Sequence, residues 1–309
     1  MPLLRSIEDL ASIERSLHLA IGVFDGVHRG HQAVIQAARE SADESGGVAC
    51  VVTFDPHPVR VLAPTYAPRL LTATEHKVRL LNELGIEHVA ILTFDLAFAE
   101  TSAETFVREL HRASHSLARI CVGEDWRFGS GGRGDVALLE RLGAELGFAV
   151  TGVPTVSVDG MTASSTRIRE AVAGGDFAIA EALLGRPYTV LGTVIQGRHL
   201  GRELGFPTAN LTVHSEQLPP TGVYAVRVSL ESGEKFPAVA NLGYRPSIEG
   251  ETARRLLEVH LLDWQGNLYD CDLEVEFVEF LRPERKFAGL EALKSQIVQD
   301  AERTREVLA

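Results

Sequence analysis

Cysteine is scarce in this sequence. Only three occur in 309 residues, and Cys50, Cys121 and Cys271 lie far apart. Their spacing matches neither a disulfide framework nor a zinc-binding pattern, so we expect a reducing compartment, the cytoplasm. No apolar run approaches the ~18–20 residues that a membrane span requires. The first nine residues turn acidic before the apolar core of a signal peptide can form, so we expect neither secretion nor a membrane partner.

A basic surface is lacking as well. Lysine and arginine total 30 against 42 aspartate and glutamate residues, which gives a net charge of −12. A general nucleic-acid-binding protein usually carries basic runs or a basic face, so we expect no nucleic-acid partner. Small anionic substrates remain compatible with this charge, because local arginines, helix N-termini and Mg²⁺ hold phosphate inside acidic proteins. No pattern in the sequence predicts or excludes an oligomer.

The first part of the chain alternates strand-like and helix-like segments. Short apolar runs separated by helices predict an α/β domain whose parallel sheet is covered on both faces. In such sheets, ligands bind beyond the carboxyl ends of the strands. The predicted strands are 19–24, 48–54, 89–94, 119–122 and 149–153, and the predicted helices are 31–45, 74–84, 103–111 and 136–146.

Two further helices are expected to close this domain. Ser164 and Ser165 can cap a helix that begins near Thr166, and another is expected over 176–184. The segment 185–187, which contains glycine and proline, would end it. We therefore predict two domains, 1–186 and 187–309.

The pattern after residue 187 is that of an antiparallel sheet. Residues 273–277 alternate apolar and acidic side chains, as in a sheet with one wet face, and the alternation shifts at Val278, which predicts a β-bulge. We expect a small barrel with an amphipathic helix over 290–308 packed on it. The strands that the pattern predicts are 188–195, 223–230, 237–240, 256–262 and 273–280.

The first candidate site is the segment Gly22-Val-Phe-Asp-Gly-Val-His-Arg-Gly-His31, which follows an apolar run. Its glycines keep side chains away from a bound phosphate. His28 and His31 would share one side of a helix N-terminus, where they could donate hydrogen bonds to a departing pyrophosphate. The alternative is an ordinary glycine-rich turn with surface histidines. To this phosphate site we assign Gly22, Phe24, Asp25, Gly26 and Gly30, with His28 and His31 as catalytic residues.

Other segments of the first domain can contribute to the same site. Residues 164–169 offer three hydroxyls and two guanidiniums at a helix start, which suits a triphosphate, although capped helices with arginines are common. Residues 123–129 follow a strand, so they lie at the ligand-binding edge or form a loop with a packed aromatic pair. From these segments we assign Asp125, Arg127, Ser164, Ser165, Thr166 and Arg169.

The second candidate site is Pro207-Thr208-Ala-Asn210. Proline stiffens the entry and leaves Thr208 and Asn210 as neighbouring oxygen donors, which suit Mg²⁺. Glycines recur just before it, and they allow backbone to wrap around phosphates; the equally open alternative is a glycine-rich loop that shapes a barrel mouth. To this site we assign Gly197, Gly201, Arg202 and Gly205.

Glu258 lies between apolar neighbours in the predicted strand 256–262. A carboxylate there could act as general base on a substrate hydroxyl. More often, a glutamate at such a position is a solvated residue of an antiparallel sheet, and the sequence alone leaves both interpretations open.

Taken together, these motifs resemble the prokaryotic bifunctional riboflavin kinase/FMN adenylyltransferases, also called FAD synthetases. The resemblance covers nearly the whole chain in the right order, and the half with the Pro-Thr-Ala-Asn motif is the more specific. The matching segments are 22–31, 53–58, 122–129, 164–169, 204–211, 222–224, 240–246, 257–263 and 282–287.

The resemblance implies a Rossmann-like nucleotidyltransferase domain followed by a six-stranded flavokinase barrel. It implies that the barrel phosphorylates riboflavin to FMN with ATP and Mg²⁺, and that the first domain joins FMN to AMP from a second ATP, which gives FAD and pyrophosphate. By matching position, Thr208 and Asn210 would bind Mg²⁺ and Glu258 would be the kinase base. Asn241, Arg245 and Arg282 would lie near the flavin or nucleotide of the kinase site.

The chain departs from the family pattern at Gln196, where a histidine is expected, and at Leu200, where a basic residue is expected. Trp126 replaces the usual phenylalanine, and Asp125 stands at a position that can be asparagine. Two other hypotheses stay open, and the changes near Gly201 favour only the first of them. The barrel could be a regulatory flavin-binding module beside a single active nucleotidyltransferase, or the whole chain a non-catalytic sensor, although a sensor has no need of His28 and His31.

Overall fold

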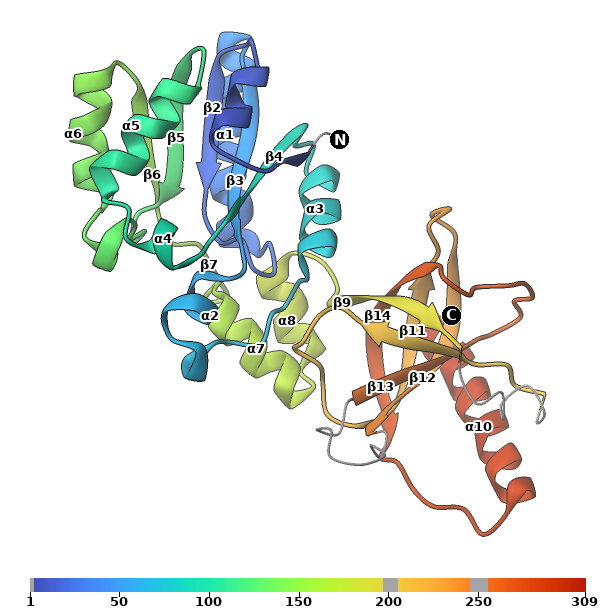
Figure 1. Cartoon of the computed structure of the whole chain (residues 1–309). Coiled ribbons are helices and arrows are strands. Elements are labelled where there is room, and N and C mark those ends of the chain that lie inside the picture. The colour runs from blue at the N-terminus through green and yellow to red at the C-terminus, as the bar shows by residue number, and fades with distance from the viewer. Residues whose placement is uncertain (1–2, 197–204, 245–254) are drawn as a thin grey trace. The chain divides into compact units, whose positions relative to one another are not determined.

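The computed structural model describes residues 3–196, 205–244 and 255–309, and the chain divides into two compact units (Figure 1). The first unit consists of residues 1–68 and 74–165, and the second of residues 69–73 and 166–309. Helix α8 (Phe177–Leu184) and nearly all of α7 (Ser165–Gly174) group with the second unit. The ring of Phe177 stacks on that of Phe277 at 5.7 Å. The predicted functional boundary between residues 186 and 187 stays a prediction.

The first unit contains the predicted parallel sheet. Its six strands run in the order β1-β4-β3-β2-β5-β6, and every neighbouring pair is parallel. The sequence pattern missed only β1, which is two residues long. The strands are β1 (Leu3–Leu4), β2 (Leu17–Ile21), β3 (Val48–Asp55), β4 (His88–Thr93), β5 (Leu117–Gly123) and β6 (Ala149–Val153).

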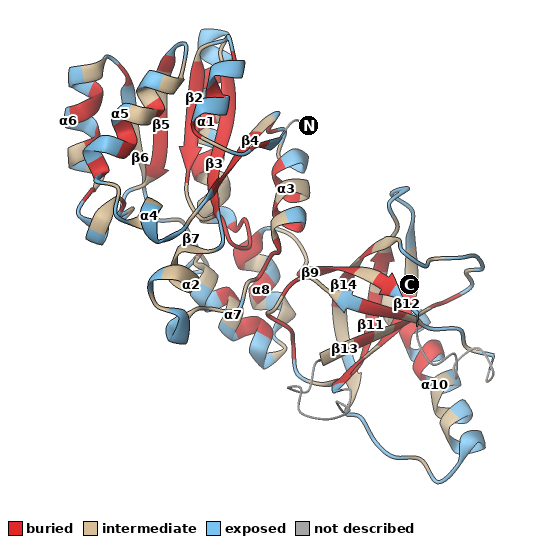
Figure 2. Ribbon diagram, viewed as in Figure 1, coloured by how far each residue is buried: buried red, intermediate tan, exposed pale blue. Residues whose placement is uncertain are grey.

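Each face of this sheet has its own apolar core, which explains why the strands are buried along their length (Figure 2). Successive residues of a strand point to opposite faces, so Leu19 packs in one core and Ala20 in the other. Helices α1 (Arg29–Ser45) and α3 (Thr74–Glu83) contribute to the core that contains Ala20. The other face is covered by α5 (Ala103–Ala113), α6 (Val136–Leu146) and the 3₁₀ helix η1 (Glu8–Ser12).

Strand β2 is the switch point of the sheet, because it lies between β3 and β5. The connections that follow β2 and β5 leave in opposite directions, and a crevice opens between them at the carboxyl ends. Short elements complete the unit around this edge. They are α2 (Pro58–Leu62), η2 (Pro64–Tyr66), α4 (Leu96–Ala99), η3 (Ser130–Gly132), β7 (Ser157–Val158) and β8 (Met161–Thr162).

The second unit contains a closed antiparallel barrel of six strands in the order β10-β13-β12-β11-β14-β9. The pattern had identified five of them and missed β10, because Asn210 and its neighbours were interpreted as a loop. The strands are β9 (Thr189–Ile195), β10 (Ala209–Val213), β11 (Gly222–Ser229), β12 (Lys235–Tyr244), β13 (Arg255–Leu261) and β14 (Asp272–Arg282).

Two further expectations for the barrel are confirmed. Val226 pairs with Phe277 and Ala225 with Glu279, so the register skips Val278, the predicted bulge. Helix α10 (Leu290–Leu308) packs on the barrel through Ala301, which joins Val223 and other residues of the barrel in a small apolar cluster. Leu290 begins the predicted apolar stripe but is 58% exposed, so the contact starts further along the helix.

His18 of β2 is a buried titratable side chain of the first unit. Its side chain is buried between the hydroxyls of Ser41 and Ser45, at 2.9 and 2.8 Å. Burial and the positive charge of Arg119 lower the pKa of His18, and burial also lowers that of His88. Below the unfolded-state pKa of about 6.5, the unfolded chain therefore binds more protons than the folded chain.

We predict that the free energy of unfolding of the first unit falls as pH drops below about 6.5. Urea titration at several pH values would measure this, followed by fluorescence of Trp126 in a Trp264→Phe background. His18→Gln should flatten the pH dependence, whereas His115→Gln, at an exposed position, should keep it. An unchanged slope in His18→Gln would contradict the assignment.

Candidate active sites

The loop that follows β2 has an unusual backbone. Phe24 and Val27 have φ angles of 52° and 44°, in the left-handed region that non-glycine residues rarely occupy. Val27 is β-branched, which makes this conformation costly unless the surroundings hold it in place. Phe24 and Val27 are both buried, so the loop is packed rather than exposed.

The loop ends in His28, which caps helix α1. The Nδ1 of His28 accepts a hydrogen bond from the backbone N–H of His31 at 3.3 Å, so a neutral His28 ring carries its proton on Nε2. The two imidazoles stack at 3.6 Å with 19° between their planes, and Phe24 meets His31 edge-on at 5.3 Å. The structure therefore brings both histidines to the N-terminus of α1, as the spacing predicted.

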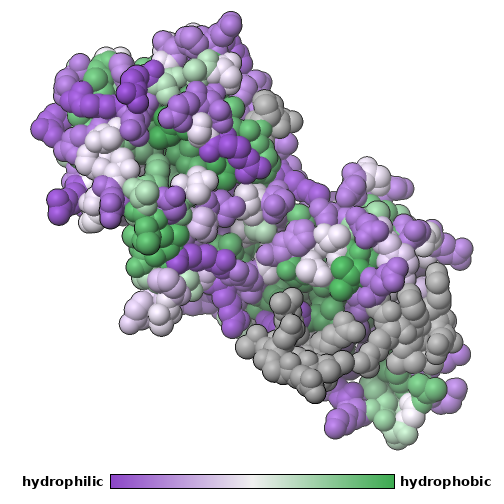
Figure 3. Space-filling model, viewed as in Figure 1, coloured by the Kyte–Doolittle hydropathy of each residue, from purple (hydrophilic) through white to green (hydrophobic). Residues whose placement is uncertain are grey.

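A cavity of about 590 Å³ opens at the carboxyl edge of the sheet, between the segments that follow β2 and β5. Its size is typical of a small-molecule site. Hydrophobic residues are also visible on the surface of the first unit (Figure 3). Seven of the residues assigned to this site line the cavity: Gly22, Phe24, His28, Gly30, His31, Asp125 and Arg127.

One wall of the cavity consists of aromatic rings in mutual contact. Trp126 and Phe128 stack at 4.3 Å with 10° between their planes, and both rings line the cavity. The segment 123–129 therefore contains a packed aromatic pair and also lies at the edge of the sheet where ligands are expected to bind. Sequence reasoning missed the other rings, because apolar residues after a strand or along a helix are typical of a core. Successive ring contacts of 5.5–6.3 Å join Phe54, Phe94, Phe98, Phe106 and Phe128.

The other residues assigned to the first site lie elsewhere. Asp25 is buried but does not line the cavity, and neither does Gly26. Ser164 and Ser165 also lie outside the lining, and the Ser165 hydroxyl donates to the backbone carbonyl of Asp25 at 2.8 Å. Thr166 and Arg169 belong to the second unit, where Arg169 donates to the carbonyl of Arg69 at 2.8 Å.

In the barrel, strand register gathers residues that are far apart in the sequence. Glu258 of β13 pairs with Asn210 of β10 on one side and with Asn241 of β12 on the other. Asn241 pairs with Val223 of β11, which pairs with Arg282 of β14. Directly paired residues of an antiparallel sheet share a face, so the four predicted polar residues form one row.

This row lies on the outer face of the barrel. Leu257 and Val259, the neighbours of Glu258, are fully buried inside, so Glu258 points outward. His260, two residues further along β13, shares this face, and its Nδ1 lies 2.8 Å from the backbone carbonyl of Pro207. A carbonyl can only accept, so His260 donates and ties the Pro-Thr-Ala-Asn motif to β13.

The donor set beside Glu258 fits a magnesium ion. Thr208 is exposed and offers a hydroxyl, Asn210 offers an amide oxygen, and the Glu258 carboxylate lies one strand away in register. Hard oxygen donors of this kind suit Mg²⁺, which keeps several waters. Among the described residues, no group of three or more histidine, cysteine, aspartate or glutamate side chains could hold a metal ion.

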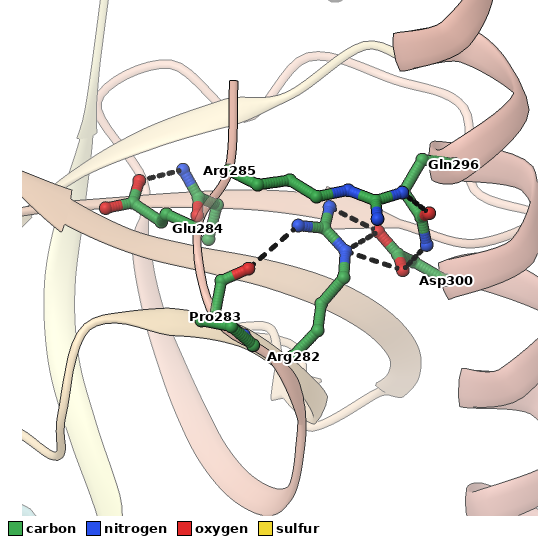
Figure 4. A network of polar contacts seen from close by, with 7 residues as sticks. Arg282, Pro283, Glu284, Arg285, Gln296 and Asp300 are labelled. Carbon is green, nitrogen blue, oxygen red and sulfur yellow. Dashed lines mark hydrogen bonds and ion pairs between the residues drawn. The ribbon is translucent and has the colours of Figure 1, made fainter. Parts of the chain in front are cut away.

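Arg282, at the end of the row, is held by a polar network (Figure 4). Arg282 donates to both carboxylate oxygens of Asp300 on α10, with its Nη2 at 2.8 Å, and the amide of Gln296 donates to the same carboxylate at 2.8 Å. Asn241 donates to Glu284 at 3.2 Å. The contacts between Arg282 and Asp300 join α10 to the barrel. The flavin or nucleotide contacts of Arg282 and Asn241 stay predictions.

Several residues assigned to the second site lie outside the part of the chain that the structure describes. They are Gly197, Gly201, Arg202 and Arg245, and Leu200 lies outside it as well. Gly205 is described, and its φ of 87° requires the left-handed region that glycine adopts easily.

Two family models match the chain in sequence order. The FAD synthetase model matches residues 10–167, and the riboflavin kinase model matches residues 184–308. A crystal structure of a Streptococcus pneumoniae protein named "Macrolide-efflux Protein" is similar over 98% of both chains, with a TM-score of 0.83 and 30% identity. None of the helices within the described ranges is long and apolar enough to span a membrane.

Curated relatives match over nearly their whole length and carry one name, "Bifunctional riboflavin kinase/FMN adenylyltransferase". The protein from Pseudomonas fluorescens is 41% identical over 100% of this chain and 98% of its own. That from Escherichia coli K12 is 41% identical, with 99% and 97% covered. That from Listeria monocytogenes is 38% identical, with 94% and 92% covered. The chain therefore belongs to the bifunctional riboflavin kinase/FMN adenylyltransferase family.

Proposed function

We propose that this chain makes FAD in two ATP-dependent steps, with residues 187–309 converting riboflavin to FMN and residues 1–186 converting FMN to FAD. The observation that carries the proposal is that each unit has its own site. Stacked histidines and aromatic rings share a cavity in the first, and Asn210 and Glu258 lie in register on the barrel of the second.

In adenylyl transfer, a phosphate oxygen of FMN attacks the α-phosphorus of ATP, and the bond to the β-phosphate breaks to release pyrophosphate. The protein need not supply a nucleophile, so catalysis rests on positioning and charge stabilisation. His28 and His31, at the N-terminus of α1, would donate hydrogen bonds to the charge that develops on the leaving pyrophosphate. Arg127 lines the same cavity and would add a positive charge.

The aromatic wall would hold the flavin ring. A planar three-ring system prefers offset-stacked or edge-on contact with aromatic side chains. The stacked rings of Trp126 and Phe128 line the cavity and offer such an aromatic surface. Phe54 and Phe98, which contact each other, extend the aromatic lining. Apolar packing on this wall would orient FMN, while its phosphate reaches the histidines.

In the kinase step, the 5′-hydroxyl of riboflavin attacks the γ-phosphorus of ATP, and ADP leaves. Glu258 would take the hydroxyl proton as general base. Thr208 and Asn210 would hold Mg²⁺, which neutralises charge on the transferring phosphoryl group. His260 fixes the Pro207 carbonyl at 2.8 Å and so keeps these donors beside Glu258.

The proposed partners are riboflavin, FMN and ATP, and the proposed compartment is the cytoplasm. The net charge of −12 argues against a nucleic-acid partner. All three cysteines are unpaired, which suits a reducing compartment. Burial raises the pKa of Cys50 to about 12 and that of Cys121 to about 11, so these thiols stay protonated and unreactive.

Chromatography of reactions with ATP and Mg²⁺, started from riboflavin or from FMN, tests the proposal. FAD from both, with FMN as an intermediate in the first, is the expected result. FAD from FMN alone would mean an inactive kinase, and Gln196 and Leu200 would be the first positions to revert.

Glu258→Gln should lower FMN formation by about 100-fold or more, because the amide cannot accept the proton. The rate of FMN conversion to FAD by the same preparation is the internal control and should stay unchanged. Normal riboflavin phosphorylation by this variant would remove Glu258 from the mechanism.

Changing His28 and His31 together to alanine should abolish FAD formation, since loss of one transition-state donor alone costs about 100-fold. Riboflavin phosphorylation should persist, and His115→Ala serves as a control at an exposed histidine. Retained FAD synthesis in the double variant would count against both histidines.

FMN should quench Trp126 fluorescence in a Trp264→Phe background, because the flavin ring would lie against the indole. These are the only two tryptophans, so Trp126→Phe leaves Trp264 as a matched reporter in the second unit. Titration with FMN in the absence of riboflavin and ATP measures the effect. Unchanged Trp126 fluorescence at FMN concentrations that support FAD formation would place the flavin elsewhere.

A further inference from the structure

Lys77 of α3 is a buried cation that the proposed reaction does not use. Only 6% of the residue is exposed, although lysine is almost never buried without partners. Its Nζ donates to the backbone carbonyl of Val23 at 2.9 Å and to the Thr53 hydroxyl at 3.3 Å. Burial lowers the pKa of Lys77, and the charges of Asp25 and Asp55 oppose this shift.

Lys77 and Thr53 both donate to the same oxygen, the backbone carbonyl of Val23 in the loop that follows β2. Val23 is the second residue of the loop after β2, and the Thr53 hydroxyl of β3 donates to the same Val23 carbonyl at 2.9 Å. A carbonyl has two lone pairs, so the ammonium and the hydroxyl together saturate this one. Neither Lys77 nor Thr53 lines the cavity, so both act on the loop from behind.

Other side chains donate to every second backbone carbonyl after that of Val23. Ser165 donates to the carbonyl of Asp25 at 2.8 Å, and the Gln32 amide donates to that of Val27 at 2.9 Å. The C=O and N–H of a trans peptide point in opposite directions, so a fixed carbonyl also fixes the N–H of the following residue.

Such fixation matters because the loop is strained. Phe24 and Val27 have positive φ angles, which persist only where surrounding contacts over-determine the backbone. Val23 precedes Phe24 directly, and Phe24 packs against His31 at 5.3 Å. A shift at Val23 would therefore reach the catalytic histidines through the backbone and through this ring contact.

We propose that Lys77, together with Thr53, is a positioning residue for adenylyl transfer, and that it holds the Val23 carbonyl so that the strained loop presents His28 and His31 to the leaving pyrophosphate. This inference rests on the proposed adenylyl transfer in the first unit. Lys77 touches no substrate; it acts through the backbone of residues 22–28.

The test compares Lys77→Met with a matched pair at Thr53. Lys77→Met keeps an unbranched side chain that is one atom shorter and removes the donor. Thr53→Val removes the hydroxyl at nearly constant shape, and Thr53→Ser keeps the hydroxyl. For each full-length variant, kcat and KM for FMN conversion to FAD are measured, with riboflavin phosphorylation as the internal control and the melting temperature as a measure of stability.

Lys77→Met should lower kcat for FAD formation by about 100-fold, the effect of small misplacement of catalytic groups, with little change in KM for FMN. Thr53→Val should lower kcat by about fivefold, as for loss of one neutral hydrogen bond. Thr53→Ser should stay near wild type, and the kinase rate should be unchanged in all three.

Wild-type kcat in Thr53→Val and in folded Lys77→Met, even with a lower melting temperature, would overturn the inference and leave both residues a purely structural role. If Lys77→Met does not fold, the two Thr53 variants test the inference by themselves. Equal kcat for FAD formation in the valine and serine variants would contradict a positioning role for the hydrogen bonds to the Val23 carbonyl. A wild-type chain that makes no FAD from FMN would overturn the proposed function and this inference with it.

Discussion

The pairing of backbone N–H and C=O groups between strands decides, in both units, where chemically useful side chains meet. A buried backbone N–H or C=O group without a hydrogen-bond partner costs free energy, so each strand pairs with its neighbours in one fixed register. In the first unit, this places β2 between β3 and β5 and opens the crevice at their carboxyl ends. In the barrel, it sets Asn210, Glu258 and Asn241 side by side.

The two proposed sites would bind phosphate in an acidic protein in different ways. The first concentrates a helix N-terminus and two imidazoles at one end of an apolar cavity, where a small number of donors carries the charge. The second combines the exposed Thr208 with Asn210, which is buried, and Glu258, which is partly buried, and their oxygen atoms suit a hydrated cation. Neither arrangement needs a basic surface, so a net charge of −12 is compatible with the use of ATP.

In both units, residues outside the candidate site hold its backbone or side chains in place. A strained loop in the first unit is fixed from behind by Lys77, Thr53 and Gln32. On the barrel, the ion pair between Arg282 and Asp300 is largely buried and joins β14 to α10. In both units, the residues that support the candidate site come from distant parts of the chain.

The sequence by itself determined the class of each half, the longer helices, every strand of the parallel sheet and the barrel except β1 and β10, the bulge at Val278 and the two candidate phosphate motifs. These follow from local periodicity and from glycine, proline and histidine at short spacing, which act over a few residues. Tertiary structure alone decided that Asn210 lies on a strand, that rings from Phe54 to Phe128 form one wall, and that Lys77 reaches Val23. Such contacts join residues tens of positions apart, and a hydrophobic or charged side chain carries no local signal of the partner that packing will bring to it.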